Sequence, residues 1–190
     1  MTEWELIEQL KQKDEGAFKT IVDTWKDMVY NTALGILQNP EDAEDVTQDV
    51  FVRVYESVNN FKGDAKFSTW MYRITVTQSL DQLRRKKRKK RFAFIESLFG
   101  KNEELINDPP DFVHPGIIIE RRESSKKLFK AIACLPENQN IAFVLNKVEG
   151  LSYQEIAEIM KMSESAVDSL LHRAKVNLRK TLQNYYYQQN

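Results

Sequence analysis

The chain contains one run of eight consecutive cations, residues 84–91, in which every side chain is lysine or arginine. Such a run binds phosphate when the backbone holds it in a fixed direction; otherwise it is a solvated, self-repelling segment. A nuclear-localisation signal has a similar composition. Because a helical pattern of apolar residues leads directly into the run, we expect its cations to be presented along a helix, as on a phosphate-binding surface.

A second set of polar side chains recurs at helical spacing between residues 42 and 53. Val46, Val50 and Val54 fall on one side of the same helix, so the polar residues occupy the opposite side. An exposed row of carboxylates can bind a basic protein partner specifically. The simpler interpretation is a plain solvated helix face. The residues of this row are Asp42, Asp45, Gln48, Asp49 and Arg53.

The strongest local motif lies between Gly150 and Ser163. Ser152 and Glu155 have the spacing of a capping box, and Ser163 can cap a second helix after a short turn. Two short helices joined in this way are typical of a helix-turn-helix, although an ordinary helical hairpin shows the same pattern. The outward side of the second helix carries base-edge and phosphate candidates, among them Arg173, Lys175, Arg179 and Lys180.

These motifs require helices to position them, and helical periodicity runs through most of the 190 residues. We expect helices over residues 15–37, from Asn39-Pro40 onward, and from a Ser68 cap into the basic run. Residues 97–117 contain three of the five prolines and predict an irregular linker. The predicted fold is therefore all-α, with two small helical domains (1–96 and 121–190) joined by a flexible linker (97–120).

The charges are strongly segregated although 28 basic residues balance 28 acidic ones. Residues 1–83 carry a net charge of −7 and residues 92–120 carry −5, whereas residues 121–190 carry +4 beside the +8 of the basic run. A neutral total therefore does not exclude a nucleic-acid partner.

Several classes of protein are disfavoured. The one cysteine, Cys134, forms no internal disulfide or multi-cysteine metal site, and no apolar stretch approaches the ~18–20 residues of a membrane span. His114 and His172 are isolated, and no triad, metal cluster or phosphate-binding glycine motif is visible. We therefore expect a cytoplasmic protein that is not an enzyme and that binds no cofactor or metal.

Two long stretches of the chain resemble a known family. Residues 43–61 and 67–85 resemble region two of bacterial sigma factors of the extracytoplasmic-function (ECF) type, and residues 135–182 are similar to region four of the same family. The resemblance implies a protein that binds core RNA polymerase, directs it to promoter DNA and helps to open the duplex. It also implies an anti-sigma protein as a partner. A free-standing helix-turn-helix regulator is the alternative.

The resemblance also implies three sets of site residues. The polar row of residues 42–53 matches the family's docking surface for polymerase. The minus-ten element of the promoter would be bound and opened by Phe61, Lys62, Phe67, Trp70, Tyr72, Arg73, Thr77, Arg84, Arg85 and Lys86, although Trp70 also suits a core position. The minus-thirty-five element would be bound by Ser165, Asp168, Ser169, His172, Arg173 and Lys175.

Two positions depart from the family pattern. Thr77 stands where relatives usually carry asparagine, so the minus-ten preference of this chain is expected to differ. Asp168 and Leu170 occupy positions that are often basic in relatives. A carboxylate disfavours phosphate but accepts a hydrogen bond from a cytosine amino group, so we expect region four to bind weakly alone.

Overall fold

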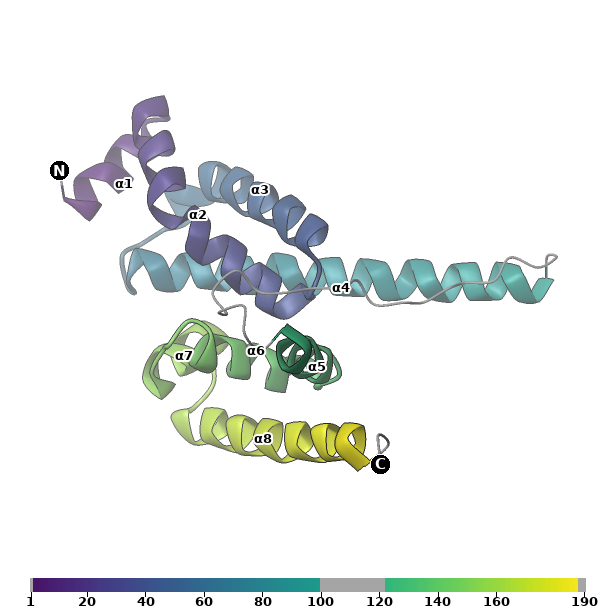
Figure 1. The fold of residues 1–190 in the computed structure, drawn as a ribbon. Helices are drawn as coiled ribbons and strands as arrows, with labels where there is room; N and C mark the ends of the chain where they lie inside the picture. Colours follow the sequence, from purple (N-terminus) through teal and green to yellow (C-terminus); the bar gives the residue numbers. More distant parts are fainter. Residues whose placement is uncertain (1, 100–121, 188–190) are drawn as a thin grey trace.

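The computed structural model describes residues 2–99 and 122–187, and within these ranges the chain forms helices and no strand (Figure 1). Side chains are described for residues 2–89, 91 and 128–183. The all-α prediction is confirmed. The elements are α1 (Glu3–Lys11), α2 (Glu15–Leu37), α3 (Pro40–Ser57), the short 3-10 helix η1 (Val58–Asn60), α4 (Phe67–Phe99), α5 (Arg122–Ala133), α6 (Glu137–Lys147), α7 (Tyr153–Met160) and α8 (Glu164–Tyr187).

Helices α2, α3 and α4 pack against one another and form the first bundle. The Asp14 side chain begins α2 by accepting a backbone hydrogen bond, and Gln38 ends it in the left-handed conformation. The Asn39 side chain then accepts a hydrogen bond of 2.9 Å from the Asp42 amide, with Pro40 as the first helical residue. Helix α3 thus begins as the sequence predicts, because a cap and a proline satisfy its first turn.

Aromatic rings fix the start of α4 to the core of the first bundle. The Phe67 ring meets Trp25 and Phe61 edge to face, with centroids 5.2 and 5.3 Å apart, and Trp70 tilts against both phenylalanines at 5.4 Å. Pairs of this kind contribute about 0.5–1.5 kcal/mol each beyond the burial of their area. The aliphatic core beside them consists of Ile21, Val29, Leu34, Val46, Val50, Val54 and Met71.

Helices α5 to α8 form the second bundle, in which α8 packs along α5, α6 and α7. The Asn177 amide on α8 donates to Gln139 on α6 at 2.8 Å, and the Asn140 amide donates to the Ile132 carbonyl at 3.0 Å. These contacts give two amide donors partners inside the core, whereas Oδ1 of Asn140 has no partner among the described residues. The core consists of Ile132, Ile141, Leu145, Ile156, Val167 and Leu171.

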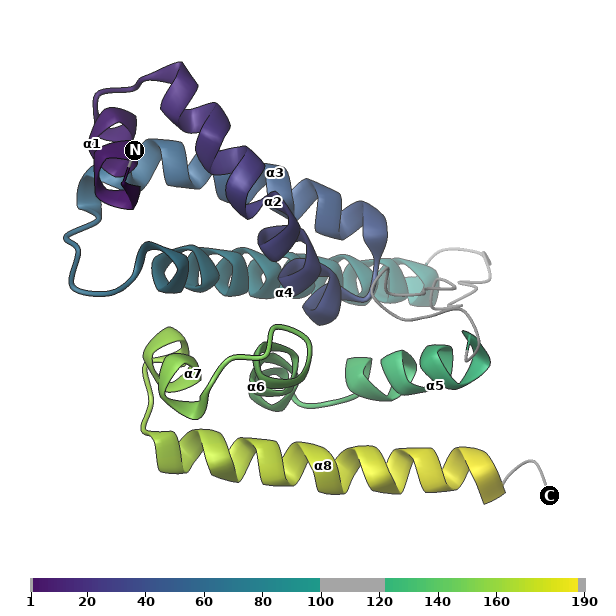
Figure 2. The ribbon, with the colours of Figure 1, turned by 60° about the vertical axis from the view of Figure 1, so that its left-hand side comes forward.

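The two bundles lie side by side, with α4 against α7 and α2 against α6 (Figures 1 and 2). Gly35 allows the close approach of α2 and α6, because a Cβ at this position would lie 2.6 Å from Cγ1 of Val144. Gly35 lies in the last turn of α2, where glycine weakens a helix less than in its interior. The contact between the bundles therefore depends on a glycine at this position.

Two helix starts differ from the predictions. Helix α1 was not predicted from the sequence, although the Thr2 and Glu5 side chains form a capping box whose spacing is visible there. Ser68 was predicted to cap α4, but the helix already begins at Phe67, so Ser68 lies within its first turn. The Lys66 carbonyl accepts from the Trp70 amide at 3.2 Å, so Lys66 and not Ser68 holds the cap position.

Helix α4 continues to Phe99, so residues 97–99 of the predicted linker are helical. The remainder of that segment, residues 100–120, lies outside the described residues, as does His114. The division into 1–96, 97–120 and 121–190 stays a prediction.

The cap of α3 can be tested by substitution. Asn39→Ala removes the acceptor for the Asp42 amide, and we expect it to lower the free energy of unfolding by about 1 kcal/mol. Asn39→Ser, which keeps an acceptor, is the matched control and should change it far less. Urea denaturation followed by circular dichroism measures both; equal effects of the two substitutions would contradict the role of the cap.

Candidate protein and nucleic-acid interfaces

Four residues of the polar row on α3 point to solvent and form what we call the α3 face: Asp45, Gln48, Asp49 and Arg53. Val52 lies beside them and is 56% exposed, which is unusual for a valine. Arg53 forms an exposed ion pair of 3.7 Å with Glu56. The α3 face therefore combines carboxylates with an exposed apolar side chain, a composition suited to a basic protein partner.

Asp42 belongs to the same row in sequence but not on the surface. The residue is 7% exposed, and its carboxylate accepts hydrogen bonds from Gln82 at 2.9 Å and from Lys86. Both donors come from α4. Asp42 therefore ties α3 to α4 and lies outside the exposed α3 face.

The basic run on α4 is partly neutralised by its neighbours. Besides the Asp42–Lys86 pair, Arg85 lies 3.8 Å from Asp49 and Arg84 lies 3.3 Å from Asp81. Exposed pairs of this kind contribute about 0–1 kcal/mol and exchange readily for other partners. The cations therefore stay available to a polyanion at a small energetic cost.

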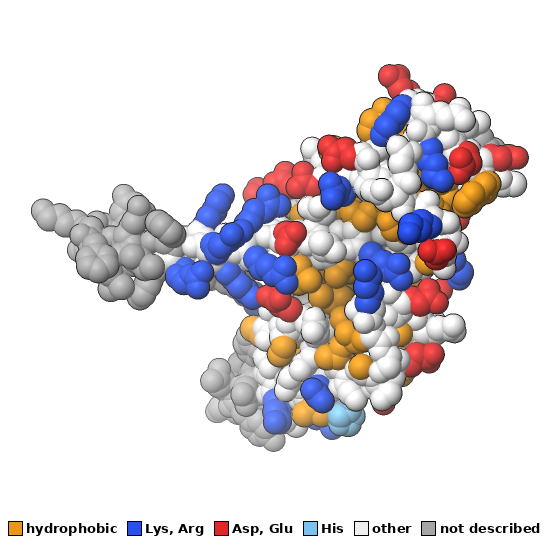
Figure 3. Space-filling view, turned by 180° about the vertical axis from the view of Figure 1, so that it is seen from behind, with side chains coloured by type: hydrophobic (Ala, Val, Ile, Leu, Met, Phe, Trp, Pro, Cys, Tyr) orange, Lys and Arg blue, Asp and Glu red, His pale blue; other side chains and the backbone are white. Residues whose placement is uncertain are grey.

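Five cations of α4 line an open groove of about 1030 Å³, the basic groove: Arg84, Arg85, Lys87, Arg88 and Arg91. Gln78 and Asp81 complete its lining. Blue side chains along the projecting end of α4 mark its position in Figure 3. The helix gives the cations one fixed axis, which favours phosphate binding over the solvated-tail interpretation.

Three of the aromatic residues predicted to contact the minus-ten element are buried in the structure. Phe61 and Phe67 are 6% and 1% exposed within the aromatic cluster, and Tyr72 is 7% exposed. A base cannot stack on rings that are covered in this way. Trp70 is half-buried, consistent with the core position that its spacing also suggested, and Lys62 is exposed.

Arg73 and Thr77 lie on the side of α4 that faces the second bundle. The Arg73 guanidinium donates to the Glu158 carbonyl of α7 from Nε at 3.2 Å and from Nη2 at 2.8 Å. The Thr77 hydroxyl donates to the Arg73 carbonyl at 2.7 Å, within its own helix. The Arg73 guanidinium is thus engaged in this arrangement, whereas the exposed Thr77 hydroxyl can still accept a hydrogen bond.

A cleft of about 580 Å³ lies between the bundles and is called the interdomain cleft. Figure 3 shows hydrophobic side chains gathered at the centre of this face, among cations. Arg53, Arg73 and Thr77 contribute its polar lining. The apolar part is lined by Trp70, Ile74, Leu80, Ile141, Ile159, Met160 and Met162.

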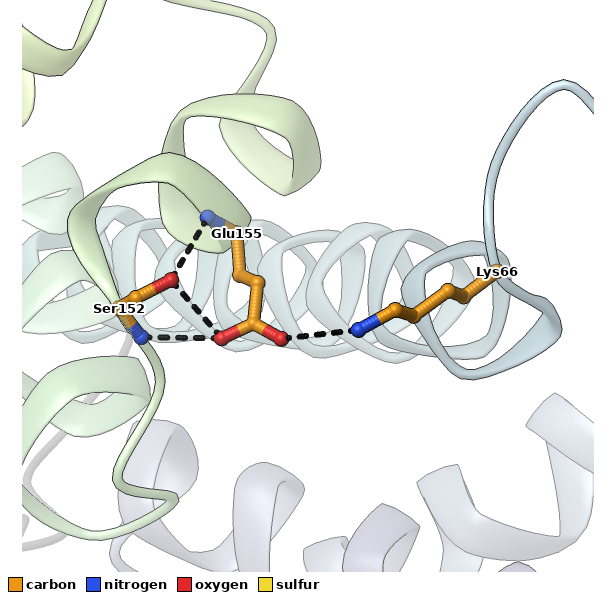
Figure 4. Close-up of polar contacts among 3 residues, drawn as sticks. All are labelled: Lys66, Ser152 and Glu155. Carbon is orange, nitrogen blue, oxygen red and sulfur yellow. Dashed lines mark hydrogen bonds and ion pairs between the residues drawn. The ribbon is translucent and has the colours of Figure 1, made fainter.

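The helix-turn-helix prediction is confirmed by α7, a short turn and α8. The Ser152 hydroxyl accepts from the Glu155 amide at 3.3 Å, while the Glu155 carboxylate accepts from the Ser152 amide at 3.0 Å and lies 3.5 Å from Lys66 (Figure 4). The hydrogen bonds from Ser152 hold the pKa of the Glu155 carboxyl below its usual value. Lys161 turns the chain in the left-handed conformation, and Ser163 caps α8.

The six predicted minus-thirty-five residues share the outer side of α8, the α8 face. Val167, Leu171 and Ala174 bury the inner side of the helix. Helix α8 lies on the side of the second bundle that is remote from the first bundle (Figures 1 and 2). The residues of the α8 face, all exposed, are Ser165, Asp168, Ser169, His172, Arg173 and Lys175.

A buried polar contact joins the bundles at Glu149, which sequence analysis did not single out. The Tyr72 hydroxyl donates to Oε2 of Glu149 at 3.0 Å. Burial raises the pKa of the Glu149 carboxyl, although Tyr72 and Thr32 oppose the rise. The Thr32 hydroxyl is fully buried close to this carboxylate but does not reach hydrogen-bond geometry with any described residue. The partners are 77 residues apart in sequence, and no local pattern predicts them.

Among the described residues, no group of three or more His, Cys, Asp and Glu side chains could hold a metal ion. Cys134 is exposed, and within the same ranges no helix is long and apolar enough to cross a membrane.

Both bundles of the chain resemble known proteins. The family model for sigma-70 region 2 matches residues 21–89, and the model for sigma-70 region 4 matches residues 125–178. The ECF RNA polymerase sigma factor SigW of Bacillus subtilis is 33% identical over 181 residues, which cover 94% of this chain and 95% of the relative. The ECF RNA polymerase sigma-E factor of Escherichia coli K12 is 29% identical, over 92% and 91% of the two chains.

Solved structures show the same fold. CnrH, in complex with the cytosolic domain of CnrY, superposes with a TM-score of 0.66 at 20% identity, over 94% of this chain and 96% of that one. RpoE of Bartonella quintana, in complex with the anti-sigma factor NepR, superposes with a TM-score of 0.63 at 20% identity, over 87% and 96% of the chains. The chain therefore belongs to the sigma-70 family of RNA polymerase sigma factors, and within it to the ECF type.

Proposed function

We propose that this sigma factor binds core RNA polymerase through the α3 face and contacts the promoter through two separate surfaces, one on α4 and one on α8. The observation that carries the proposal is the distribution of charge over the exposed surface. Asp45 and Asp49 face solvent beside the apolar Val52, whereas the cations are gathered in the basic groove and on α8. One molecule thus offers a protein-binding face and two phosphate-binding faces.

The minus-ten surface would consist of Lys62, Trp70, Arg73 and Thr77 together with the cations of the basic groove. Opening DNA costs stacking energy, so the separated strand needs aromatic contacts and a positively charged path. The buried rings of Phe61, Phe67 and Tyr72 would act indirectly by holding the loop before α4 in place. Lys86 would contribute charge only after it leaves Asp42.

The minus-thirty-five surface would be the α8 face, placed in the major groove. Arg173 is suited to a guanine, and Asp168 can accept a hydrogen bond from a cytosine amino group. Lys175 is suited to a phosphate, which supplies affinity without sequence preference. We expect this surface to bind weakly alone, and its affinity to combine with that of α4 on one polymerase.

The remaining predictions follow from this assignment. We take 1–96 and 121–190 as the two functional units and 97–120 as their connection. The protein would act in the cytoplasm with polymerase and carry out no chemistry of its own. Because RpoE was solved with the anti-sigma factor NepR, we also propose an anti-sigma protein as a partner of this chain.

Transcription in vitro tests the assignment. Core RNA polymerase with the purified protein should initiate at a defined subset of genomic fragments, and core alone should not. A mobility-shift assay should show specific binding only when core is present. Specific binding by the protein alone, with no stimulation of core, would identify a free-standing regulator instead.

The α3 face generates a prediction about core binding. Asp45→Lys reverses one exposed charge, and we expect about a tenfold weaker affinity for core at low salt, since like charges then face each other. Asp27→Lys makes the same change on α2 and should leave the affinity unchanged. Biolayer interferometry against immobilised core measures both, and equal losses would assign the effect to net charge alone.

The α8 face generates a prediction about sequence preference. We expect Arg173→Ala to lose about 1–3 kcal/mol of discrimination between bases at one position of the minus-thirty-five element. Initiation should therefore fall at the cognate promoter but not at a promoter that is altered at that position. Lys175→Ala should weaken holoenzyme binding to all sequences alike and reduce the salt slope by about 0.9. Filter binding over a salt series measures both; an unchanged slope in the Lys175 variant would remove that residue from the phosphate contacts.

A further inference from the structure

An exposed tryptophan on α1 belongs to none of the surfaces described above. Among the residues whose side chains the structure describes, two aromatic ones are exposed, Trp4 at 53% and Tyr153 at 36%. Tryptophan is highly buried on average in folded proteins, because its large ring gains much from leaving water. The Trp4 indole is therefore a candidate for binding a flat apolar ligand.

Helix α1 does not depend on the Trp4 ring for its own packing. Leu6, Ile7 and Leu10 are buried and form the inner side of the helix. Through this side α1 contacts α2 and the short helix η1. A substitution at Trp4 should therefore leave α1 in place.

Two contacts hold the Trp4 ring in position. Gly63, in the loop between η1 and α4, lies so close that a Cβ there would be 3.1 Å from Cζ3 and 3.4 Å from Cη2 of the indole. Gly63 has a φ of +82°, a conformation that glycine adopts without strain. On α1, Nζ of Lys11 lies 5.3 Å from the ring centroid, within the range of a cation–π contact. A ring that is held in this way loses little freedom when a ligand binds.

The loop that contacts Trp4 carries two exposed cations, Lys62 and Lys66. Lys66 lies 3.5 Å from Glu155, and both groups of this pair are accessible to water. A pair of this kind contributes little and exchanges its partner readily. Both lysines are thus available to a phosphate of a strand that reaches the ring.

Acidic groups balance these cations, so charge alone would not hold a nucleic acid here. Glu8 pairs with Lys11 at 2.8 Å, and the Glu5 carboxylate accepts a hydrogen bond from the Thr2 amide at 2.8 Å. Asp64 in the loop is exposed. Stacking on the indole must therefore supply most of the affinity at this end of the protein.

Trp4 lies at the end of the proposed strand path that is remote from the basic groove. Figures 1 and 2 show α1 beside the loop that leads into α4, while the basic run lies towards the other end of that helix. From Phe67 to Arg91, α4 extends over about 36 Å at 1.5 Å per residue. A strand that follows α4 from the groove past Trp70 would reach the loop and then Trp4.

The aromatic residues nearest to this point cannot replace Trp4 as a stacking surface. Phe61 and Phe67 are buried in the aromatic cluster, and Trp70 is half-buried against them. An unpaired base exposes two flat faces, and a tryptophan ring can stack on either of them whatever the base. The Trp4 indole combines this chemistry with exposure and a fixed position.

We propose that Trp4 is a stacking platform for one unpaired nucleobase of the opened promoter, beside the bases contacted by the loop before α4. The inference rests on the function proposed for that loop and α4, and it adds a residue of α1 to the surface. Because stacking does not read the edge of a base, the platform holds the separated strand without a sequence preference of its own.

Fluorescence of 2-aminopurine locates the stacked base. Holoenzyme is assembled from core polymerase and the full-length protein, and is bound to a promoter fragment whose minus-ten region is kept unpaired by mismatches. The probe occupies successive positions of each strand in turn. We expect quenching at one position, or at two adjacent ones, that is lost in Trp4→Ala and retained in Trp4→Phe.

Two further variants separate stacking from packing. Trp4→Leu keeps an apolar side chain against Gly63 without a flat ring, and it should lose the quenching as Trp4→Ala does. Tyr153→Ala removes the other exposed aromatic residue and is the matched control, so its quenching should equal that of the unsubstituted protein. Thermal unfolding followed by circular dichroism checks that each variant is folded.

The affinity of the holoenzyme for the same fragment gives a second measurement. Trp4→Ala and Trp4→Leu should bind it about five- to a hundredfold more weakly, the range that stacking of one base supplies. The loss in Trp4→Phe should be smaller, because a ring is still present.

The outcomes separate the platform from the function on which it rests. Unchanged quenching and affinity in Trp4→Ala, with normal initiation, would overturn the platform and leave the proposed function intact. Weaker binding of Trp4→Ala to core, with unchanged quenching at saturating core, would assign the ring to a protein contact and also overturn the platform. If the unsubstituted holoenzyme neither binds the fragment nor initiates, the proposed function fails and the platform fails with it.

Discussion

Helix α4 links the two bundles and the basic groove, because one helix packs in the first core, contacts the second bundle and carries the cations of the groove. Met71 and Thr75 are fully buried in the core of the first bundle, while Tyr72 and Arg73 on an adjacent side meet the second bundle. The basic groove continues along the same axis. Since a helix turns its successive residues by a fixed angle, the position of the core residues determines where the guanidinium and the cations point.

This shared helix explains why acidic and basic segments that are distant in sequence meet in the structure. Asp42 and Asp49 lie opposite Lys86 and Arg85 because α3 packs along α4. The Asp42 carboxylate is buried and ties α3 to α4, although its partner Lys86 is partly exposed. The Asp49 pair is exposed on both sides and exchanges its partner at little cost. The net charge of zero thus comes from neighbouring surfaces of opposite charge. A polyanion or a basic protein can replace the ion pairs between them.

Local patterns predicted the elements better than the contacts between them. The Asn39-Pro40 start of α3, the Ser152–Glu155 box and the Ser163 cap involve residues within four positions of one another, so their spacing is sufficient to predict them. The burial of Phe61, Phe67 and Tyr72 depends on helices far away in sequence, and aromatic side chains suit a core as well as a base. Gly35, in the last turn of α2, is a local signal for a close approach, although sequence analysis did not single it out.

The two proposed DNA surfaces differ in exposure, which bears on the order of events at a promoter. Every residue of the α8 face is exposed while the two bundles are packed together, so double-stranded DNA can contact it without any change between them. The proposed minus-ten surface would bind single strands, which exist only after polymerase has begun to open the duplex. The contact of Arg73 with α7 therefore involves a surface whose proposed ligand is not yet present, whereas the cations of the basic groove stay exposed to phosphate.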